Sequence, residues 1–260
     1  MEQMDRDSGL IDKGLIRRRF GRALESYRQH ATVQGRVNER LITLLKNNTG
    51  QSRFNRALEI GCGPGGLAKR LLDEFAVGEL HLNDICGEWE EVLRHELGDS
   101  FHAFHESDGE AFPFQGRFDL LLSASTVQWF HRPERFFLAA AAHQSKGDVL
   151  LFSMFGCENF NEIRTVTGIG LAYPEAEQLK KWLKNDYDVR VYEEELISLR
   201  FNSPIEVLRH MKNTGVTATG AAFWGKKDLE AFCSRYNALF VEDGEVKLTY
   251  HPIYIYAIKK

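Results

Sequence analysis

A glycine-rich turn between an apolar run and a helical pattern constrains this chain more than any other feature. The apolar run ends at Ile60, and the turn after it contains Gly61, Gly63, Gly65 and Gly66. Glycine reaches positive φ angles easily and lets a ligand lie against bare backbone. In an open α/β sheet, such a turn lies at the carboxyl end of a strand, where ligands bind. We therefore expect a ligand site at this turn.

The alternation of strands and helices around the turn predicts the fold class. The predicted strands are 57–61, 80–84, 101–105, 118–124 and 148–155, and the predicted helices between them are 66–75, 88–97 and 133–143. This alternation implies an α/β fold with a mostly parallel central sheet and helices on both faces.

The segments on either side of this alternation have other patterns. They predict a helix over 13–46 with a break near Gly35, mostly helix over 160–183, one or two strands over 189–201, a helix that begins at the capping box Ser203–Glu206, a helix over 228–239 and a closing strand over 246–258.

The spacing of the glycines leaves two classes of nucleotide-binding protein open. Gly61, Gly63 and Gly66 satisfy the pattern G-x-G-x-x-G, which keeps an oxidoreductase with a nicotinamide cofactor as an alternative. Asp84 ends the next predicted strand, where a carboxylate can accept hydrogen bonds from ribose hydroxyls. Glu59 favours the other class, because an acid two residues before alternating glycines resembles motif I of the class I S-adenosylmethionine-dependent methyltransferases.

The resemblance extends to the later strand ends. Asp84 matches the ribose-binding acid, Asp108–Gly109 match the pair that contacts the adenine edge, and Phe118–Ser123 match motif IV, which lies beside the methyl group. The resemblance implies a Rossmann-like methyltransferase fold and S-adenosylmethionine as cosubstrate. The cofactor-binding residues that it implies are Glu59, Gly61, Gly63, Gly65, Asp84, Asp108, Gly109 and Ser123.

Nearly the whole chain resembles one family of these enzymes, the malonyl-[acyl-carrier protein] O-methyltransferases that open biotin synthesis. The resemblance is carried by the helix with Phe20, Ala23, Tyr27, His30 and Ala31, by Val127–Trp129, by Leu208–Gly215 and by Leu248–Tyr250. One position departs from it, since many relatives have an asparagine where this chain has Ala124. That departure puts in doubt a side-chain amide at this position, but not backbone contacts to the cofactor.

The pattern along the chain and the resemblance together predict a division of the chain. We expect an N-terminal helical lid and partner-docking segment over 1–46, the S-adenosylmethionine-binding core over 47–156, a substrate cap over 157–225, and a C-terminal helix with an antiparallel closing strand over 226–260.

The implied reaction moves a methyl group onto the free carboxylate of a malonyl thioester. A carboxylate has a reference pKa of about 4, so it is ionised at neutral pH and no general base is expected. Alignment of the reacting atoms and removal of water would then accelerate the reaction. Alignment alone can lower an activation barrier by roughly 7–11 kcal/mol. The substrate-pocket residues implied are Tyr27, as part of a lid, Gln128, Trp129, and Arg209 with Lys212 as counter-charges for the carboxylate.

Charge along the chain suggests how a carrier protein could dock. The formal net charge is −4, yet residues 13–40 contain eight basic side chains and only two acidic ones, Glu25 and Glu39. Acyl-carrier protein is strongly acidic, so we expect docking residues within this segment. They are Arg17, Arg18, Arg19 and Arg22.

Several other properties follow from composition. The four cysteines show no paired spacing, so we expect no metal site and no disulfide framework, and free thiols suggest the cytoplasm. The acidic balance gives no reason to expect nucleic acid or membrane as a partner. No apolar run is long enough to span a membrane. We expect a monomer. Two further alternatives stay open: a methyltransferase that acts on another small molecule or on RNA, and a non-catalytic protein that binds S-adenosylmethionine.

Overall fold

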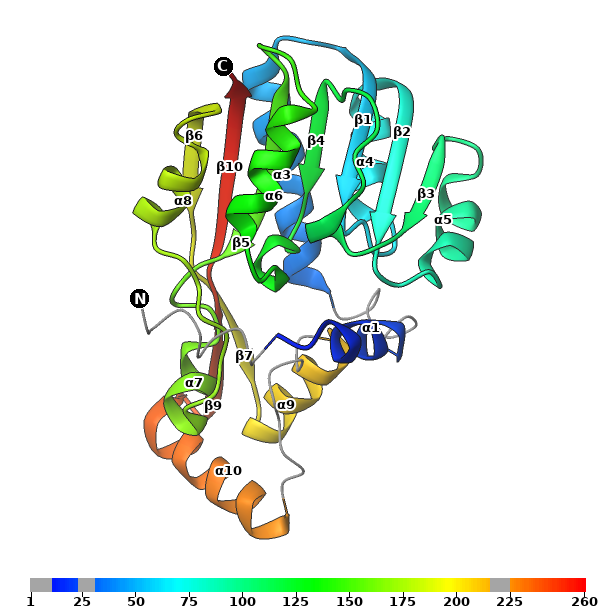
Figure 1. Cartoon of the computed structure of the whole chain (residues 1–260). Coiled ribbons are helices and arrows are strands. Elements are labelled where there is room, and N and C mark those ends of the chain that lie inside the picture. The colour runs from blue at the N-terminus through cyan, green and yellow to red at the C-terminus, as the bar shows by residue number, and fades with distance from the viewer. Residues whose placement is uncertain (1–10, 23–30, 216–224) are drawn as a thin grey trace. The chain divides into compact units, whose positions relative to one another are not determined.

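The computed structural model describes residues 11–22, 31–215 and 225–260 (Figure 1). The chain forms two compact units, which we describe separately. The larger unit contains Thr32–Met154, Pro174–Glu194 and Ile253–Lys260, and the smaller one contains Phe155–Tyr173, Glu195–Pro252 and the described residues before Thr32.

A seven-stranded sheet forms the centre of the larger unit, in the order β3-β2-β1-β4-β5-β10-β6. Its strands are β1 (Arg53–Ile60), β2 (Ala76–Asp84), β3 (Ala103–Glu106), β4 (Leu120–Ser123), β5 (Val149–Phe155), β6 (Tyr187–Glu194) and β10 (Pro252–Lys259). The first five pair in parallel, while β10 pairs with β6 in antiparallel fashion. Every residue of β4 and β5 is buried, as expected for strands covered on both faces. The predicted mostly parallel α/β sheet is confirmed.

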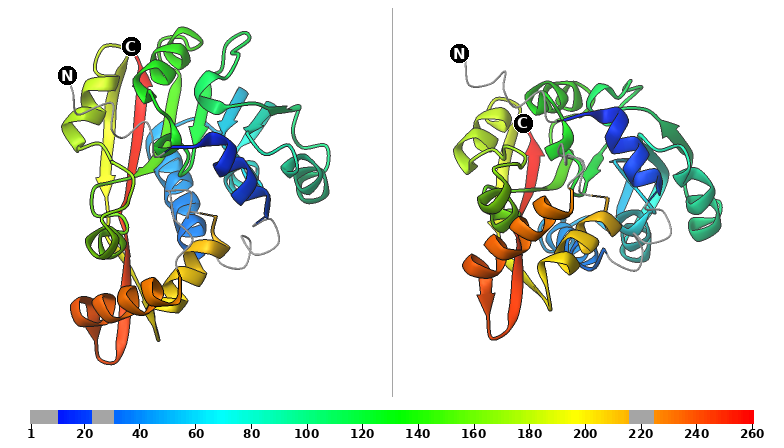
Figure 2. Two further views of the ribbon diagram at one scale, coloured as in Figure 1. Left: turned by 60° about the horizontal axis from the view of Figure 1, so that its bottom comes forward. Right: turned by 90° about the horizontal axis from the view of Figure 1, so that it is seen from below.

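Helices cover both faces of this sheet (Figure 2). On one face α3 (Thr32–Thr49) packs against α4 (Gly66–Glu74), and on the other α6 (Pro133–Ala142) packs against α8 (Ala176–Leu183). The helix α5 (Trp89–Leu97) connects β2 to β3 and buries three of its side chains. No described helix has the length and apolar character needed to cross a membrane.

The smaller unit combines a short antiparallel sheet with helices. The sheet has the order β7-β9-β8. Its elements are α1 (Lys13–Arg22), α7 (Asn161–Thr167), β7 (Ile197–Phe201), α9 (Pro204–Asn213), α10 (Lys226–Phe240), β8 (Val241–Glu242) and β9 (Glu245–Tyr250). Ser203 caps α9 as predicted, because its side chain accepts a hydrogen bond from the backbone N–H of Glu206.

Two sequence-based predictions about these elements were wrong. Gly35 does not interrupt a helix, because it lies within the first turn of α3, where one glycine costs only about 1 kcal/mol. The closing segment 246–258 is not one strand. It divides at His251 into β9 and β10, which belong to different sheets. Pro252, the first residue of β10, was a sequence signal for this division, because proline within a run of strand residues marks the start of a strand or an irregularity.

The strand pairings also assign segments to units differently from the predicted division. Residues 157–225 were expected to form a cap, but α8 and β6 belong to the larger unit, because β6 pairs with β10 along its whole length. Conversely, α10 and β9 belong to the smaller unit, because β9 pairs with β7.

A buried carboxylate holds the smaller unit together, which gives a first prediction. Glu162 of α7 is 2% exposed and accepts hydrogen bonds from the Thr249 backbone N–H at 3.0 Å and the Thr249 hydroxyl at 2.6 Å. Replacing Glu162 with alanine leaves both donors unsatisfied, so we expect the free energy of unfolding to fall by about 2–3 kcal/mol in urea titrations. The exposed neighbour Glu158 is the control, and Glu158→Ala should change the free energy of unfolding by less than about 0.5 kcal/mol. Equal losses in the two variants would contradict the assignment.

Candidate functional site

The backbone of the glycine-rich turn requires glycine at two points for different reasons. Gly61 has a φ of 71°, and a Cβ on it would lie 2.1 Å from the Thr126 hydroxyl oxygen. Gly63 has a φ of 50°, and a Cβ on it would meet nothing within 4 Å. The turn is therefore closely packed against the loop after β4 at Gly61, and leaves open space at Gly63.

The end of the neighbouring strand β2 fixes the position of this turn. The Asn83 carbonyl oxygen accepts hydrogen bonds from the Gly61 N–H at 2.8 Å and the Cys62 N–H at 2.9 Å. The Asp84 carboxylate accepts from the Gly63 N–H and the Cys86 N–H, both at 2.9 Å. The turn and β2 therefore form one hydrogen-bonded structure, and Asp84 retains lone pairs for further donors.

Two acids are buried at this edge of the sheet. Glu59 is 1% exposed, accepts a hydrogen bond from the Ala68 N–H at the start of α4, and leaves its Oε2 atom without a partner. Burial, and then the nearby Asp84, raise the pKa of Glu59 to about 8. Burial also raises the pKa of Asp84 to about 6, although backbone N–H donors oppose the shift. At neutral pH the two carboxyl groups therefore differ in protonation state, because Glu59 is mostly protonated and Asp84 is mostly ionised.

The loop after β3 is held against the same strand end. Asp108 caps a short turn of 3-10 helix, η1 (Gly109–Ala111), by accepting the Glu110 N–H at 3.0 Å. Gly109 is buried, and a Cβ on it would lie 2.6 Å from the Ile60 Cγ2 atom. The structure thus brings the predicted pair Asp108–Gly109 to the end of β1, beside the glycine-rich turn.

The end of β4 carries the last predicted cofactor residue and an unusual backbone. The Ser123 hydroxyl donates to the Ile60 carbonyl oxygen at 3.0 Å, so it joins β4 to β1. Ser125 has a φ of 51°, which is strained for a residue other than glycine and is typical of functional loops. Gln128 and Trp129 follow in the 3-10 turn η2 (Val127–Trp129), and both are buried. The Gln128 side chain donates to the Ser125 carbonyl, and its Oε1 atom has no partner.

The predicted substrate-pocket residues are divided between the two units. Gln128 and Trp129 belong to the larger unit, whereas Arg209 and Lys212 belong to the smaller one. Arg209 and Lys212 are both exposed and lie three residues apart on α9, so they share one side of that helix. Tyr27 lies outside the described residues.

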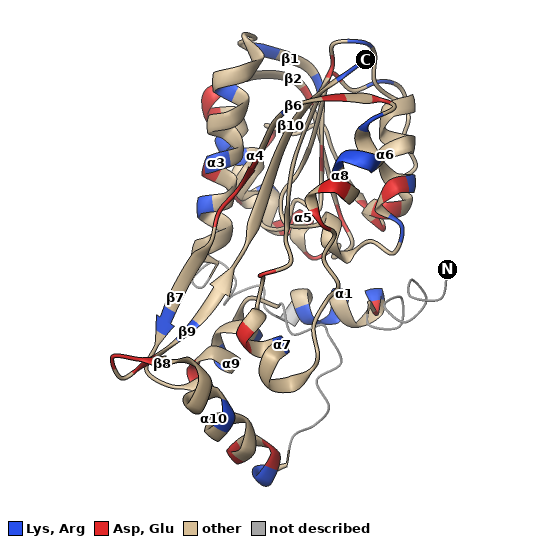
Figure 3. Ribbon diagram, turned by 90° about the vertical axis from the view of Figure 1, so that its left-hand side faces the viewer, with Lys and Arg blue, Asp and Glu red and all other residues tan. Residues whose placement is uncertain are grey.

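The four arginines predicted to dock a carrier protein all lie on α1, which has no acidic residue (Figure 3). The side chains of Arg17 and Arg18 are exposed. Arg19 differs, because its Nη1 atom is buried without a partner, and burial together with the adjacent Arg18 lowers its pKa. Arg17 and Arg18 are therefore better placed to meet a partner than Arg19.

Sequence reasoning missed two residues that position the site. Asn83 is fully buried, and its amide donates to the Ser107 carbonyl, the Ser107 hydroxyl and the His105 carbonyl, each at 2.9 Å. Thr126 occupies the space where Gly61 would have a Cβ, and its hydroxyl donates to the Ala124 carbonyl at 3.0 Å. A polar residue directly before Asp84, in an otherwise apolar strand end, was the available signal for Asn83. No sequence signal identified Thr126.

The donors and acceptors here suit S-adenosylmethionine, which carries a positive sulfonium, ribose hydroxyls and amino groups. Six buried side-chain atoms of the described residues lack a hydrogen-bond partner. Three of these are oxygen atoms at or just beyond the ends of β1, β2 and β4: the amide oxygens Asn83 Oδ1 and Gln128 Oε1, which are acceptors, and the carboxyl oxygen Glu59 Oε2. Together with the Asp84 carboxylate and the open space at Gly63, they form an acceptor-rich edge on which a cationic nucleoside can bind.

Comparisons with known proteins define the class of enzyme fold to which this chain belongs. Residues 58–152 match the family model described as "Methyltransferase domain". The fold also resembles the crystal structure of magnesium protoporphyrin IX methyltransferase from Synechocystis, solved with bound S-adenosylmethionine. That likeness has a TM-score of 0.53 at 13% identity and covers 89% of this chain and 83% of the other. The chain has the fold of the class I S-adenosylmethionine-dependent methyltransferases.

Two relatives narrow the class further. The malonyl-[acyl-carrier protein] O-methyltransferase of Haemophilus ducreyi is 39% identical over 96% of this chain and 98% of its own length. The protein of the same name from Bacteroides fragilis is 41% identical over 95% of this chain, which spans only 51% of that relative. The chain belongs to the malonyl-[acyl-carrier protein] O-methyltransferase family.

The buried Glu59 gives a prediction about stability and pH. An unfolded glutamate has a pKa of about 4.3, whereas the pKa of Glu59 in the folded protein is about 8. Between these values the folded state binds more protons than the unfolded state, so this residue makes stability fall as pH rises. We expect Glu59→Gln to flatten the decline in melting temperature from pH 5 to pH 8 and to be more stable than the wild type at pH 8.

The measurement is thermal unfolding of both proteins, without ligand, across that pH range. Glu91→Gln, at an exposed position on α5, is the control and should follow the wild type. A Glu59→Gln variant that loses stability as steeply as the wild type would refute this account of the buried carboxyl.

Proposed function

We propose that this chain transfers a methyl group from S-adenosylmethionine to the free carboxylate of malonyl-[acyl-carrier protein], giving the methyl ester that primes pimeloyl synthesis for biotin. The observation that carries the proposal is the acceptor-rich strand edge, in a chain that aligns over nearly its whole length with relatives of that name. Bound S-adenosylmethionine supplies an electrophilic methyl group on a positively charged sulfur.

The residues at the strand ends hold the cosubstrate in this proposal. The bare backbone at Gly61, Gly63 and Gly65 accommodates its methionine part. The Asp84 carboxylate accepts hydrogen bonds from the ribose hydroxyls while it keeps the Gly63 N–H, and Asp108 with Gly109 contacts the adenine edge. Glu59 acts beneath the turn, where its buried carboxyl holds the start of α4 in place.

No residue needs to act as a general base in this reaction. The malonyl carboxylate is already an anion at neutral pH, since its reference pKa is about 4. The protein's contribution is to align a carboxylate oxygen with the methyl carbon and to exclude water. The buried Gln128 and Trp129, three and four residues after the strained Ser125, are suited to line the acceptor pocket.

A carboxylate taken out of water needs a counter-charge. Arg209 is the candidate, because a guanidinium can hold a carboxylate through two parallel hydrogen bonds, and Lys212 adds a second charge on the same side of α9. Tyr27 is proposed as part of the lid. We further propose that the protein acts as a cytoplasmic monomer, in keeping with its four free cysteines.

The direct test is mass spectrometry of malonyl-[acyl-carrier protein] after incubation with the chain and S-adenosylmethionine. We expect one added methyl group on the malonyl moiety. Asp84→Asn should weaken S-adenosylmethionine binding about tenfold or more, because it removes a charged acceptor. The exposed Asp73 on α4 provides the control, and Asp73→Asn should bind as the wild type does.

The outcomes separate the alternatives. Binding of S-adenosylmethionine without transfer to any tested malonyl thioester would favour a non-catalytic binding protein. Transfer to another small molecule, but not to the malonyl carrier, would replace the substrate in this proposal. Equal affinities in Asp84→Asn and Asp73→Asn would remove Asp84 from the site.

The basic helix α1 generates a separate prediction about the carrier protein. We expect the double variant Arg18→Glu and Arg22→Glu to raise the Michaelis constant for malonyl-[acyl-carrier protein] at least tenfold, because like charges repel an acidic partner. The effect should shrink as salt is added. The matched control reverses two exposed lysines on α10, Lys226 and Lys227, and should have a much smaller effect. If a small malonyl thioester suffers equally in the α1 variant, docking is not the role of this helix.

A further inference from the structure

A cluster of nitrogen and oxygen ligands lies on the larger unit, away from the residues assigned to the methyl donor. Glu79 and His81 are two residues apart on β2, so their side chains emerge on the same face of the sheet. His102 immediately precedes β3, the neighbouring strand, and its backbone N–H donates to the Leu80 carbonyl at 2.7 Å. One ligand atom from each of Glu79, His81 and His102 lies within 4.8 Å of the other two.

We propose that Glu79, His81 and His102 bind a divalent transition-metal ion of the zinc class, which links β2 to the start of the edge strand β3. Two imidazoles and one carboxylate are a ligand set that zinc uses, and water can take the fourth tetrahedral position. Ligand atoms bound to one tetrahedral zinc ion at about 2.1 Å lie about 3.4 Å apart, so the side chains must move closer together to bind an ion. Glu79 and His102 are exposed and can rotate through the small remaining distance.

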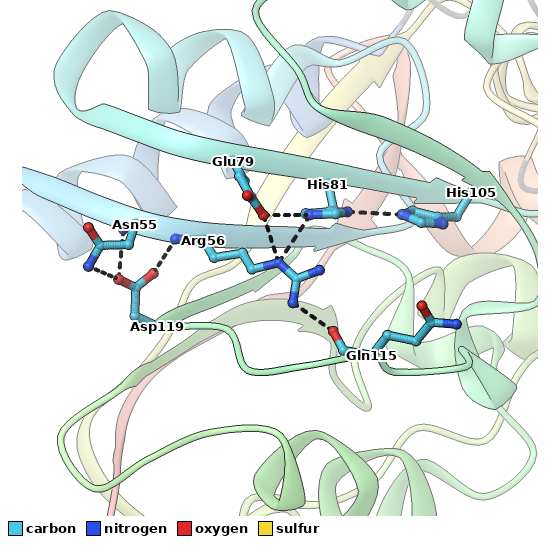
Figure 4. A network of polar contacts seen from close by, with 7 residues as sticks. All are labelled: Asn55, Arg56, Glu79, His81, His105, Gln115 and Asp119. Atoms are coloured by element: carbon cyan, nitrogen blue, oxygen red, sulfur yellow. Dashed lines mark hydrogen bonds and ion pairs between the residues drawn. The ribbon is translucent and has the colours of Figure 1, made fainter.

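A positive side chain already lies within the cluster, and a metal ion would have to displace it. The Arg56 Nε atom of β1 lies 3.0 Å from the Glu79 carboxylate and 3.2 Å from His81 Nε2 (Figure 4). The same guanidinium has other partners, since its Nη1 donates to the Gln115 carbonyl at 2.7 Å and its Cζ lies 4.5 Å from the centre of the Phe118 ring. These contacts can retain Arg56 when an ion takes its place between Glu79 and His81.

His81 has the environment of a metal ligand. Its side chain is 6% exposed, and its second ring nitrogen, Nδ1, lies 3.1 Å from His105 Nε2, an outer contact that fixes the orientation of the ring.

Binding would stabilise a weak part of the sheet. The strand β3 has four residues, lies at the edge of the sheet, and leads directly to the loop with Asp108. A metal bridge between β2 and the residue before β3 would favour the folded state by mass action, because the ligands are not assembled in the unfolded chain. We therefore expect the bound ion to stabilise this edge of the sheet.

The test measures Zn²⁺ binding to the purified full chain by equilibrium dialysis, together with thermal unfolding at a fixed excess of Zn²⁺. We expect one ion per chain and a rise in melting temperature. His102→Asn should weaken binding at least about tenfold and abolish the rise. His95, which is 85% exposed on α5, provides the matched control, and His95→Asn should bind as the wild type does.

Two further variants test the competing guanidinium and the exposed thiol. Arg56→Met, which preserves an apolar stem against Phe118, should bind Zn²⁺ more tightly because the competing charge is gone. Cys157→Ser removes an exposed thiol that could itself bind zinc, and should leave binding unchanged. Three results would each overturn the proposal: no bound ion in either the wild type or Arg56→Met, undiminished binding in His102→Asn, or loss of binding in Cys157→Ser or His95→Asn.

Discussion

The candidate site depends on how the end of β2 holds the glycine-rich turn that follows β1. The Asn83 carbonyl and the Asp84 carboxylate accept three consecutive backbone N–H groups, those of Gly61, Cys62 and Gly63. Without these acceptors, a segment with so many glycines would lose its conformation to entropy. The Asn83 amide extends the same structure to the loop after β3. The ends of three strands are thereby held together, which is the preorganisation that the proposed methyl transfer, with no general base, would require.

This arrangement has an electrostatic cost that a cationic ligand would offset. Burial of Glu59 and Asp84 raises the pKa of both groups, to about 8 and about 6. Each shift reports a free-energy penalty for the charged form. A positive sulfonium bound nearby, as in the proposed function, would favour ionisation of both carboxyls. The same buried acids that lower the stability of the unliganded protein at high pH would then strengthen binding of the cationic ligand. Groups with such shifted pKa values are common at functional sites.

Local pattern predicted the part of the fold that local interactions determine. The strand–turn–helix predicted over 57–75 and the acid at Asp84 could be located from the sequence, although β1 begins four residues earlier, because glycine conformation and strand period are properties of short segments. The assignment of the two halves of the closing segment to different sheets could not, because it depends on which strands each half pairs with. The cluster of Glu79, His81 and His102 escaped notice for a related reason. Only strand register brings the residue before β3 beside β2.

The type of residue in each unit follows from the charge of the proposed acceptor. A carboxylate needs no proton removed, so selectivity must come from positive groups that recognise an anion and its acidic carrier. The larger unit supplies mostly acceptors at the candidate cofactor site, in Glu59, Asp84 and Gln128. In the proposed function, the smaller unit supplies cations, on α1 and at Arg209 and Lys212 of α9. Recognition of a cationic methyl donor by acceptors and recognition of an anionic substrate by cations are opposite electrostatic tasks, so the proposal assigns them to different sets of residues.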